Sequence, residues 1–402
     1  MINKKINNSF LLLFSILPVS ILAGPAVSLI NILLIDIFFL ILIIFKKEYS
    51  FLKNDTIKYF LIFYIYLIMN SFISIDKEVG FLRNFGFLRF IILFVAFNYF
   101  FKQNFFLKKV LFVWSFIISF ILMDIFIESF TGQNLAGYGQ DYGRRIVSFF
   151  KNEAIVGGYV NAFYLIIIGF LFFNFKEKNK SFILIYSIIL LIAIFMTGER
   201  SNSIKAFLGF LLFYLSFKDY DFKKKTILLT SIIILFSALI LNSQFLKMRF
   251  INQIQYHISQ DQIYFKLYRS GYEVFKNNIF FGVGNKNYRI ETCKKTHEDK
   301  EKKDTYFCNT HPHQIYFEML SEHGLLGSLF IFFIFYKLIF SKIKCVLREN
   351  NYIQIGSLIY LTLTFLPLIP SGAFFSDYMI NLFIINLSIM YSSSKKLNIF
   401  NP

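Results

Sequence analysis

An arginine lies in a helix-breaking tetrapeptide at residues 197–200, which read Thr-Gly-Glu-Arg between two apolar runs. The threonine and glycine can end one helix, and Ser201 or Asn202 is expected to cap the next. Arg200 then lies near a helix N-terminus, and both that terminus and a guanidinium group favour anions. The alternatives are that Arg200 reaches lipid headgroups or pairs with Glu199.

A second arginine lies within residues 264–275, whose spacing predicts an amphipathic helix. Tyr268, Tyr272 and Phe275 share one face of this helix by their 3–4 spacing. Arg269 could reach a phosphate from the rim of such a helix. The alternative is an ordinary solvated arginine.

A third segment holds three of the five histidines of the chain. Thr310 can cap a helix there, Pro312 suits the first turn, and Gly324 is expected to end it. His311 and His313 then lie where the helix begins, and a neutral histidine can act as a general base near physiological pH. One alternative is a metal site, although no convincing further ligands follow in the sequence. The other is a structural histidine that bonds loop carbonyls.

The elements that must position these residues are long apolar segments. Of the 402 residues, 56% are hydrophobic and 16% charged, whereas soluble domains are usually about half apolar and a quarter charged. A spanning helix needs roughly 17–25 mostly apolar residues, and helices satisfy their own backbone groups inside lipid. The sequence therefore predicts an all-α polytopic membrane protein with about twelve transmembrane helices. The apolar runs cover 10–23, 26–45, 59–75, 85–101, 110–127, 154–174, 182–196, 205–217, 226–241, 325–340, 353–370 and 373–391.

Lysine and arginine recur in every second connection between these runs. Under the positive-inside rule this bias places those connections and both termini in the cytoplasm. The connection 242–324 then lies outside as one large periplasmic loop with short helices, where a lid or substrate-binding face is expected. The predicted division is residues 1–241 with the first nine membrane helices, the loop 242–324 with the catalytic motif, and residues 325–402 with the last three helices and a cytoplasmic tail.

The remaining composition restricts cofactors and partners. The net charge of +18 does not indicate nucleic-acid binding, because the basic residues form short clusters between apolar runs and no single stripe. No Walker A motif or metal-ligand cluster stands out, so no cofactor is predicted. Cys293 and Cys308 both fall in the outer loop and could pair in an oxidising periplasm, with two free thiols as the alternative. Cys345 falls in a predicted cytoplasmic loop and is expected to be a free thiol.

Together these segments resemble the O-antigen ligase and O-antigen polymerase superfamily of bacterial envelope glycosyltransferases. The matching pieces are residues 145–153, 197–200, Arg269 with 281–284, 311–316 and 322–327. The similarity is strongest over about 140–330, and the flanks match only as apolar helices. The order, spacing and shared outer location of the motifs make the set specific, although each motif alone is weak.

Three positions depart from the family pattern. Gln314 stands where an asparagine usually follows the second histidine, and its longer amide keeps the donor and the acceptor but shifts them. Ile279 stands where a proline often follows Asn278, and Ser148 stands where a glycine is frequent. None of these departures removes an arginine or a histidine.

The resemblance implies transfer of a glycan from an undecaprenyl pyrophosphate carrier, without metal or nucleotide, outside the cytoplasmic membrane. The acceptor is lipid A core in ligases and another carrier-linked unit in polymerases. Arg200 and Arg269 then bind the pyrophosphate and stabilise its developing charge, while His313 takes the acceptor proton. The implied substrate-binding residues are Arg145, His311 and Tyr268.

The predicted protein is therefore an O-antigen ligase-like glycosyltransferase of the bacterial inner membrane, with its active site facing the periplasm. Its partners are a carrier-linked glycan donor, a lipid A core or glycan acceptor, and membrane lipids. A polymerase of the same superfamily would keep the site and change the acceptor. A lipid-linked glycan transporter would instead spread charges through midplane helices and show inverted repeats. A non-catalytic envelope scaffold should tolerate loss of His313.

Overall fold

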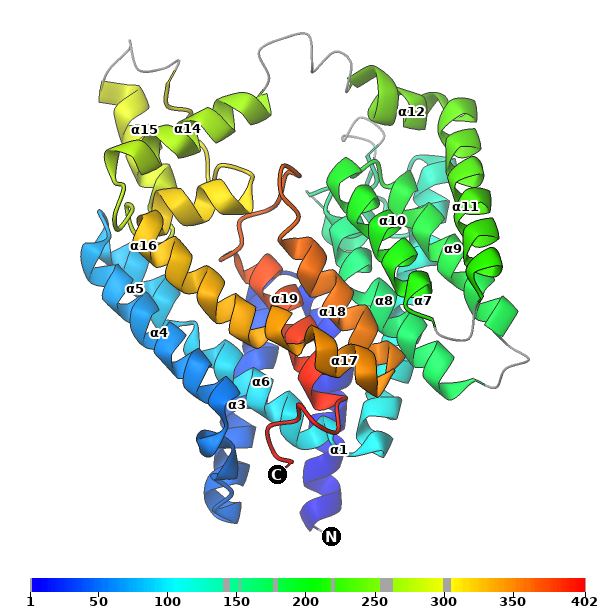
Figure 1. Ribbon diagram of the computed structural model, residues 1–402, viewed down its shortest axis with the longest axis horizontal. Helices are drawn as coiled ribbons and strands as arrows, with labels where there is room; N and C mark the ends of the chain where they lie inside the picture. The colour runs from blue at the N-terminus through cyan, green and yellow to red at the C-terminus, as the bar shows by residue number, and fades with distance from the viewer. Residues whose placement is uncertain are drawn as a thin grey trace.

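A computed structural model describes residues 2–139, 145–151, 153–175, 180–217, 221–253, 263–298 and 305–401, and the regular structure within these ranges is helical (Figure 1). The first helices are α1 (Ile2–Ser15), α2 (Leu17–Leu22), α3 (Pro25–Lys46), α4 (Asp55–Ile73), α5 (Lys77–Phe85), α6 (Leu88–Phe101), α7 (Asn104–Thr131), α8 (Val156–Asn174), α9 (Lys180–Met196) and α10 (Arg200–Leu215). The later ones are α11 (Phe222–Asn242), α12 (Gln244–Lys247), α14 (Ile263–Asn277), α15 (Tyr288–Glu298), α16 (Ile315–Leu338), α17 (Ile343–Glu349), α18 (Tyr352–Thr364) and α19 (Asp377–Ser392). Short 3-10 helices occur at Ser50–Lys53, Ser148–Phe150 and Phe340–Lys342, and a π-helical turn at Met248–Asn252.

Each apolar run of the sequence carries a helix or a pair of helices. Seven segments of the described chain are long and apolar enough to cross a membrane: Pro25–Lys46, Asp55–Ile73, Lys77–Phe101, Asn104–Thr131, Val156–Asn174, Lys223–Asn242 and Ile315–Glu349. Helices α9 and α18 are apolar but shorter. The chain is thus a multi-pass membrane protein, and a total of twelve crossings stays a prediction.

Helix α8 forms the centre of the bundle. Of its apolar window, 83% is buried inside the protein, against 44% for α3 and for α7. Buried polar groups tie it to its neighbours: the Tyr159 hydroxyl donates to the carbonyl of Pro18 at 2.9 Å, and Asn386 Nδ2 donates to that of Ala162 at 3.0 Å. Such interhelical hydrogen bonds are a common means of joining helices that lie in lipid.

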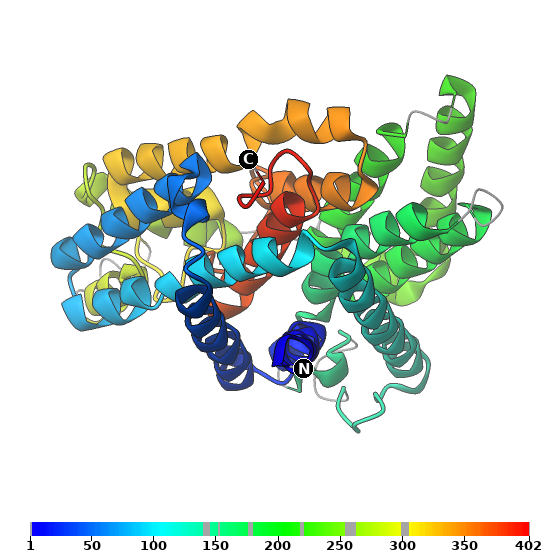
Figure 2. The same cartoon turned by 90° about the horizontal axis from the view of Figure 1, so that it is seen from below.

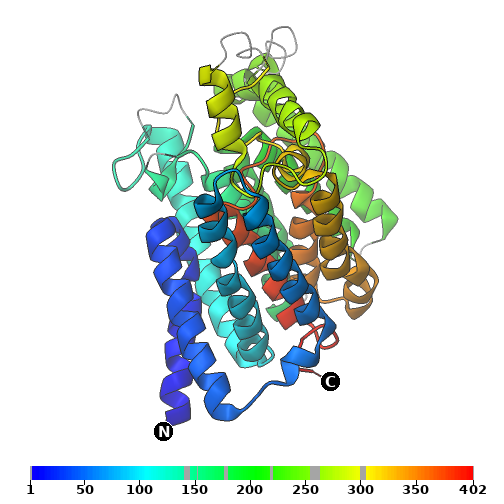
Figure 3. The same cartoon turned by 90° about the vertical axis from the view of Figure 1, so that its left-hand side faces the viewer.

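The two termini lie at one end of the molecule, and α12, α14 and α15 lie at the opposite end (Figures 1 and 3). We call this opposite end, which carries the predicted loop 242–324, the loop end. Seen from the terminal end, α4, α5, α14 and α16 occupy one side and α9, α10 and α11 the other (Figure 2). Termini at a common end are what an even number of crossings requires. The side of the membrane on which the loop end lies stays a prediction.

The turn at residues 280–284 interlocks with a kink in α16. Gly324 has a φ of 65° and a ψ of −171°, so α16 breaks there and then continues to Leu338. Four backbone hydrogen bonds join the turn to the kink: Val283 N to Ser321 O (3.0 Å), Gly284 N to Glu322 O (2.9 Å), Leu325 N to Ile279 O (2.6 Å) and Leu326 N to Phe280 O (3.2 Å). The expected helix end at Gly324 is therefore confirmed, because the backbone there is not helical and a second helical segment follows it. The turn supplies partners for the backbone groups that this break frees.

Alanine at Gly324 should destabilise the protein. A φ of 65° with an extended ψ is accessible mainly to glycine, and a Cβ atom there would lie 2.4 Å from the backbone of Phe280. We expect Gly324→Ala to lower the free energy of unfolding by about 1–3 kcal/mol, measured as a lower midpoint of thermal unfolding in detergent. Gly137→Ala is the matched control, because Gly137 also has a positive φ but no atom within 4 Å of its Cβ position. Equal shifts for the two variants would remove the interlock as the cause.

Candidate active site

The turn between α9 and α10 is held by the buried carboxylate of Glu199. This carboxylate accepts hydrogen bonds from the backbone amides of Gly157 and Gly158, at 2.6 and 3.1 Å, where α8 begins. A third comes from Asn202 Nδ2 at 2.7 Å. Burial raises the pKa of Glu199, and these hydrogen bonds oppose the rise. Glu199 itself occupies the N-cap position of α10, so the predicted cap at Ser201 or Asn202 is wrong.

This arrangement leaves the guanidinium group of Arg200 available. Arg200 is the first residue of α10 and is only partly buried. No hydrogen bond or ion pair joins its side chain to another residue in the described ranges. The alternative of pairing with Glu199 is not observed there, because three donors already occupy that carboxylate. A free guanidinium group at a helix N-terminus is suited to an anion.

Two further guanidinium groups lie near Arg200. Arg145 donates from Nη2 to the carbonyl oxygen of Ala154 at 2.9 Å. Arg249 lies in the π-helical turn that follows α12. Burial, and then the charges of Arg145 and Arg200, lower the pKa of Arg249 to about 10, and Arg249 donates to the carbonyl oxygen of Gly198 in the turn that carries Arg200. Sequence reasoning missed Arg249, because no motif in the loop 242–324 distinguishes it from the other basic residues.

The helix after the histidines begins at Ile315 and is capped by Gln314. Gln314 Oε1 accepts hydrogen bonds from the backbone amides of Tyr316 and Phe317, at 2.7 and 3.0 Å. The predicted cap at Thr310 is therefore wrong, because the helix starts further along the chain. The cap also gives a physical reason for an amide side chain at this position, where the family usually has asparagine.

His313 combines a partly open ring with unused nitrogens. It has a φ of 54°, which few residues other than glycine adopt. Its ring centroid lies 3.9 Å from that of His311 and 6.1 Å from that of Tyr264. Neither of its ring nitrogens hydrogen-bonds to another residue in the part of the chain that the structure describes. Burial lowers the pKa of His313 below its ordinary value of 6.5, so the neutral imidazole can accept a proton near pH 7.

His311 is buried and its nitrogens are already in contact with the surrounding chain. Nδ1 lies 3.0 Å from the hydroxyl of Thr310, and Nε2 lies 3.3 Å from the carbonyl oxygen of Ser371. Burial, followed by the charges of His313 and Lys286, lowers the pKa of His311 to about 3. These contacts favour the structural alternative for His311, in which it holds the loop before α19 against the histidine segment.

Helix α14 matches the predicted amphipathic helix but presents its residues differently from expectation. Tyr268 stacks on Phe317 of α16, with 5.4 Å between ring centroids, and burial raises its pKa to about 12. Packing between α14 and α16 therefore accounts for this ring. Arg269 is exposed, and among the described residues no contact joins it to Arg200 or His313.

Tyr264, in the first turn of α14, contacts the histidine segment. Its ring contacts that of His313 edge-on. After burial and the two arginines, Tyr264 is the next group that affects the pKa of Arg249. Side chains from α10, from the π-helical turn, from α14 and from the segment before α16 thus all lie at the loop end. We call this set the candidate site; its members are Arg145, Arg200, Arg249, Tyr264 and His313.

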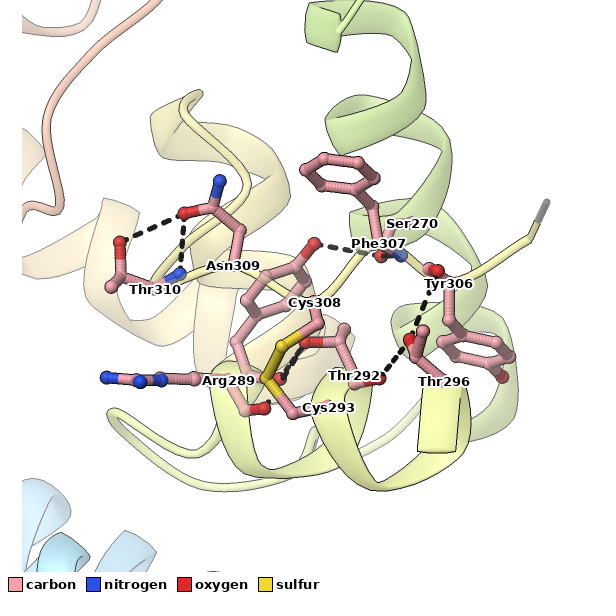
Figure 4. The surroundings of a disulfide bond; sticks show 11 residues. Ser270, Arg289, Thr292, Cys293, Thr296, Tyr306, Phe307, Cys308, Asn309 and Thr310 are labelled. Atoms are coloured by element: carbon pink, nitrogen blue, oxygen red, sulfur yellow. Dashed lines mark hydrogen bonds between the residues drawn. A yellow bond between two sulfur atoms is a disulfide. The ribbon is translucent and has the colours of Figure 1, made fainter. Parts of the chain in front are cut away.

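A disulfide joins α15 to the segment that leads to the histidines. Cys293 is bonded to Cys308, with 4.4 Å between their Cα atoms (Figure 4), and Cys345 is free. Beside this bond, the hydroxyl oxygen of Ser270 in α14 accepts a hydrogen bond from the amide of Phe307 at 3.0 Å. The cross-link and this hydrogen bond hold the chain just before the histidines and so limit its freedom.

A cavity of about 390 Å³ opens beside Arg145. Its wall combines Arg145, Glu128 and Ser243 with apolar side chains such as Phe195 of α9 and Leu239 of α11. A mixed wall of this kind suits an amphiphile with a charged head and an apolar tail.

Residues 185–332 match the family model described as O-antigen ligase. This region is similar to the O-antigen ligase family. The match begins in α9 and ends in α16 beyond the kink, so it contains Arg200, Arg249 and His313 but not Arg145. The resemblance to the O-antigen ligase superfamily is thereby confirmed over this region. No curated protein matches the chain.

The matched region depends on elements outside it. The amides of Gly157 and Gly158 in α8 hold Glu199. Ser371, in the loop before α19, donates its amide to the carbonyl oxygen of His313 at 2.8 Å. Helix α8 and the loop before α19 therefore hold the arginine turn and the histidine segment of the matched region.

Proposed function

We propose that the protein transfers a glycan from undecaprenyl pyrophosphate to lipid A core oligosaccharide, at the periplasmic face of the bacterial inner membrane. The observation that carries this proposal is the His313 imidazole, whose pKa burial lowers, together with the guanidinium groups of Arg200 and Arg249, all within the region similar to the O-antigen ligase family. Similarity to this family supports a transferase role in the assembly of O-antigen or a related polysaccharide.

The donor in this reaction already carries an activated sugar, so no nucleotide is consumed. The bond that breaks joins the anomeric carbon to a diphosphate oxygen, and negative charge grows on that oxygen. Arg200, with Arg145 beside it, would bind the diphosphate and stabilise this charge. Arg269, exposed on α14, is proposed to contact the same anion when the donor is bound.

The acceptor hydroxyl must lose its proton as it attacks. His313 would accept that proton while the hydroxyl oxygen forms a bond with the anomeric carbon. The electron pair of the broken bond leaves with undecaprenyl pyrophosphate, and solvent later removes the proton from the imidazolium. His311 would fix the histidine segment through Thr310 and Ser371 without touching substrate.

The direct test is to reconstitute the purified protein with a carrier-linked glycan and to offer lipid A core or a second carrier-linked unit. Sugar gained by lipid A core supports the proposal. Growth of the carrier-linked unit alone would assign polymerisation to the same site. Passage of intact donor across a vesicle membrane without any transfer would indicate a transporter and overturn the proposal.

The pH dependence of glycan transfer should reflect the partly buried imidazole of His313. Burial lowers the pKa of His313 from 6.5, and the base acts in its neutral form, which predominates above its folded-state pKa. We therefore expect kcat/KM for the acceptor to fall only at pH values below 6.5. The measurement is the pH profile of kcat/KM at saturating donor. An acid limb centred at or above that ordinary histidine value would contradict the assignment.

A further inference from the structure

Arg249 is attached to the backbone of the 197–200 turn. Its Nε and Nη2 atoms both donate to the carbonyl oxygen of Gly198, at 3.2 and 2.9 Å, although the two residues are 51 positions apart. Nη1 donates to Gln253 Oε1 at 2.6 Å. A guanidinium group has five N–H donors, so these contacts leave one N–H on each Nη atom unused by the described residues.

Aromatic packing fixes the segment that carries Arg249 against the same turn. Gly198 has a φ of 73°, and a Cβ atom there would lie 2.8 Å from the ring of Phe245. The ring of Phe250 stacks on that of Phe195 in α9, with 5.3 Å between centroids. The anchor is therefore a packed contact and not a chance approach of a long side chain. A π-helical turn, such as the one that holds Arg249, frequently marks a functional site.

Among the described residues, positive charge predominates around Arg249. The positive charges of Arg145 and Arg200 lie close by, and Glu199 is the acidic group that acts on Arg249. The carboxylate of Glu199 is already held by the donors of α8 and of Asn202. Bringing several guanidinium groups together costs free energy, and a phosphate anion that binds between them offsets this cost.

We propose that Arg249 is a further guanidinium ligand of the donor diphosphate, pinned to the Gly198 carbonyl so that its two remaining N–H groups face the anion beside Arg200. This inference rests on the proposed function for the identity of the anion. In this proposal the π-helical turn after α12 forms one wall of the diphosphate site, and α10 forms the opposite wall. The donor diphosphate would then be held from both sides of the 197–200 turn.

The test measures diphosphate binding and transfer separately on the full-length protein in detergent. Inorganic pyrophosphate is titrated by calorimetry, and the donor KM is measured in the reconstituted reaction. We expect Arg249→Gln to weaken pyrophosphate binding by about 10- to 100-fold, since a hydrogen bond to a charged group is lost. The donor KM should rise with it, and the acceptor KM should not change. Arg249→Lys keeps the positive charge but not the two-pronged guanidinium geometry, so we expect pyrophosphate affinity to fall about tenfold.

Lys247→Gln is the matched control, because Lys247 is an exposed cation two residues earlier on the same segment. The inference is overturned if Arg249→Gln binds pyrophosphate as tightly as the unmodified protein. It is also overturned if Lys247→Gln weakens pyrophosphate binding as much as Arg249→Gln does. If Arg249→Gln does not fold, Arg249→Lys decides in the same way. Transfer with an unaltered donor KM in the variant would leave the proposed function standing without this residue. Pyrophosphate binding that needs Arg249, in a protein that transfers no glycan, would keep the anion site and refute the proposed function.

Discussion

Replacing His313 by alanine is expected to lower the rate of glycan transfer by about 10²- to 10⁴-fold, the usual contribution of a positioned general base. The ring nitrogens of His313 bond to none of the described residues, so the loss should come from chemistry and not from a broken structural contact. Donor binding, measured with undecaprenyl pyrophosphate, should stay within a few-fold of the unmodified protein. The measurement is kcat in the reconstituted reaction with lipid A core.

The backbone at His313 requires a second variant. Its φ of 54° is tolerated better by asparagine than by alanine. His313→Asn therefore keeps the backbone conformation while removing the base, and it should lose as much activity as His313→Ala. Normal transfer by His313→Asn would refute the assignment. Loss in the alanine variant alone would show that the turn, and not the imidazole, matters.

Replacing Arg200 by alanine is expected to lower kcat/KM for the donor by about 10²- to 10³-fold, as for removal of a group that stabilises a leaving anion. No hydrogen bond or ion pair joins the Arg200 side chain to another described residue. The midpoint of thermal unfolding should therefore stay close to that of the unmodified protein. The measurements are donor kinetics and thermal unfolding in the same detergent.

The control for Arg200 is Arg289→Ala. Arg289 is an exposed arginine of α15, beside the disulfide (Figure 4), and we expect its loss to leave donor kinetics unchanged. Arg200→Lys should recover part of the activity, because it restores the charge without the two-pronged geometry. Donor kinetics equal to those of the unmodified protein in Arg200→Ala would mean that the diphosphate is bound elsewhere.

The local pattern of side chains along the sequence was enough to predict several helices. The 3–4 spacing of aromatic residues predicts an amphipathic helix, and α14 is that helix. Long apolar runs predict helices, and a helix or helix pair covers each of them. These features depend on the period of side chains along one stretch of chain, which is legible without any knowledge of neighbours.

Other features depend on distant partners and could not be predicted. Glu199 occupies the N-cap position of α10, and its carboxylate accepts hydrogen bonds from two amides of α8. The helix end at Gly324 was predicted, but the second helical segment that follows it directly was not, because the turn at 280–284 hydrogen-bonds to the break from a distant part of the chain. Arg269 and Tyr268 lie on one helix, yet the packing of α14 on α16 uses the tyrosine and leaves the arginine exposed.

The sequence by itself determined the helical membrane class, the O-antigen ligase resemblance, and the arginine and histidine types suited to an anion and a proton. Hydropathy, motif order and side-chain chemistry are properties of the chain and need no fold. Only the tertiary structure decided that Arg249 hydrogen-bonds to Gly198, beside Arg200, and that Tyr264 contacts His313. Those outcomes depend on contacts between residues far apart in the chain, whose free energies arise only when the helices pack together.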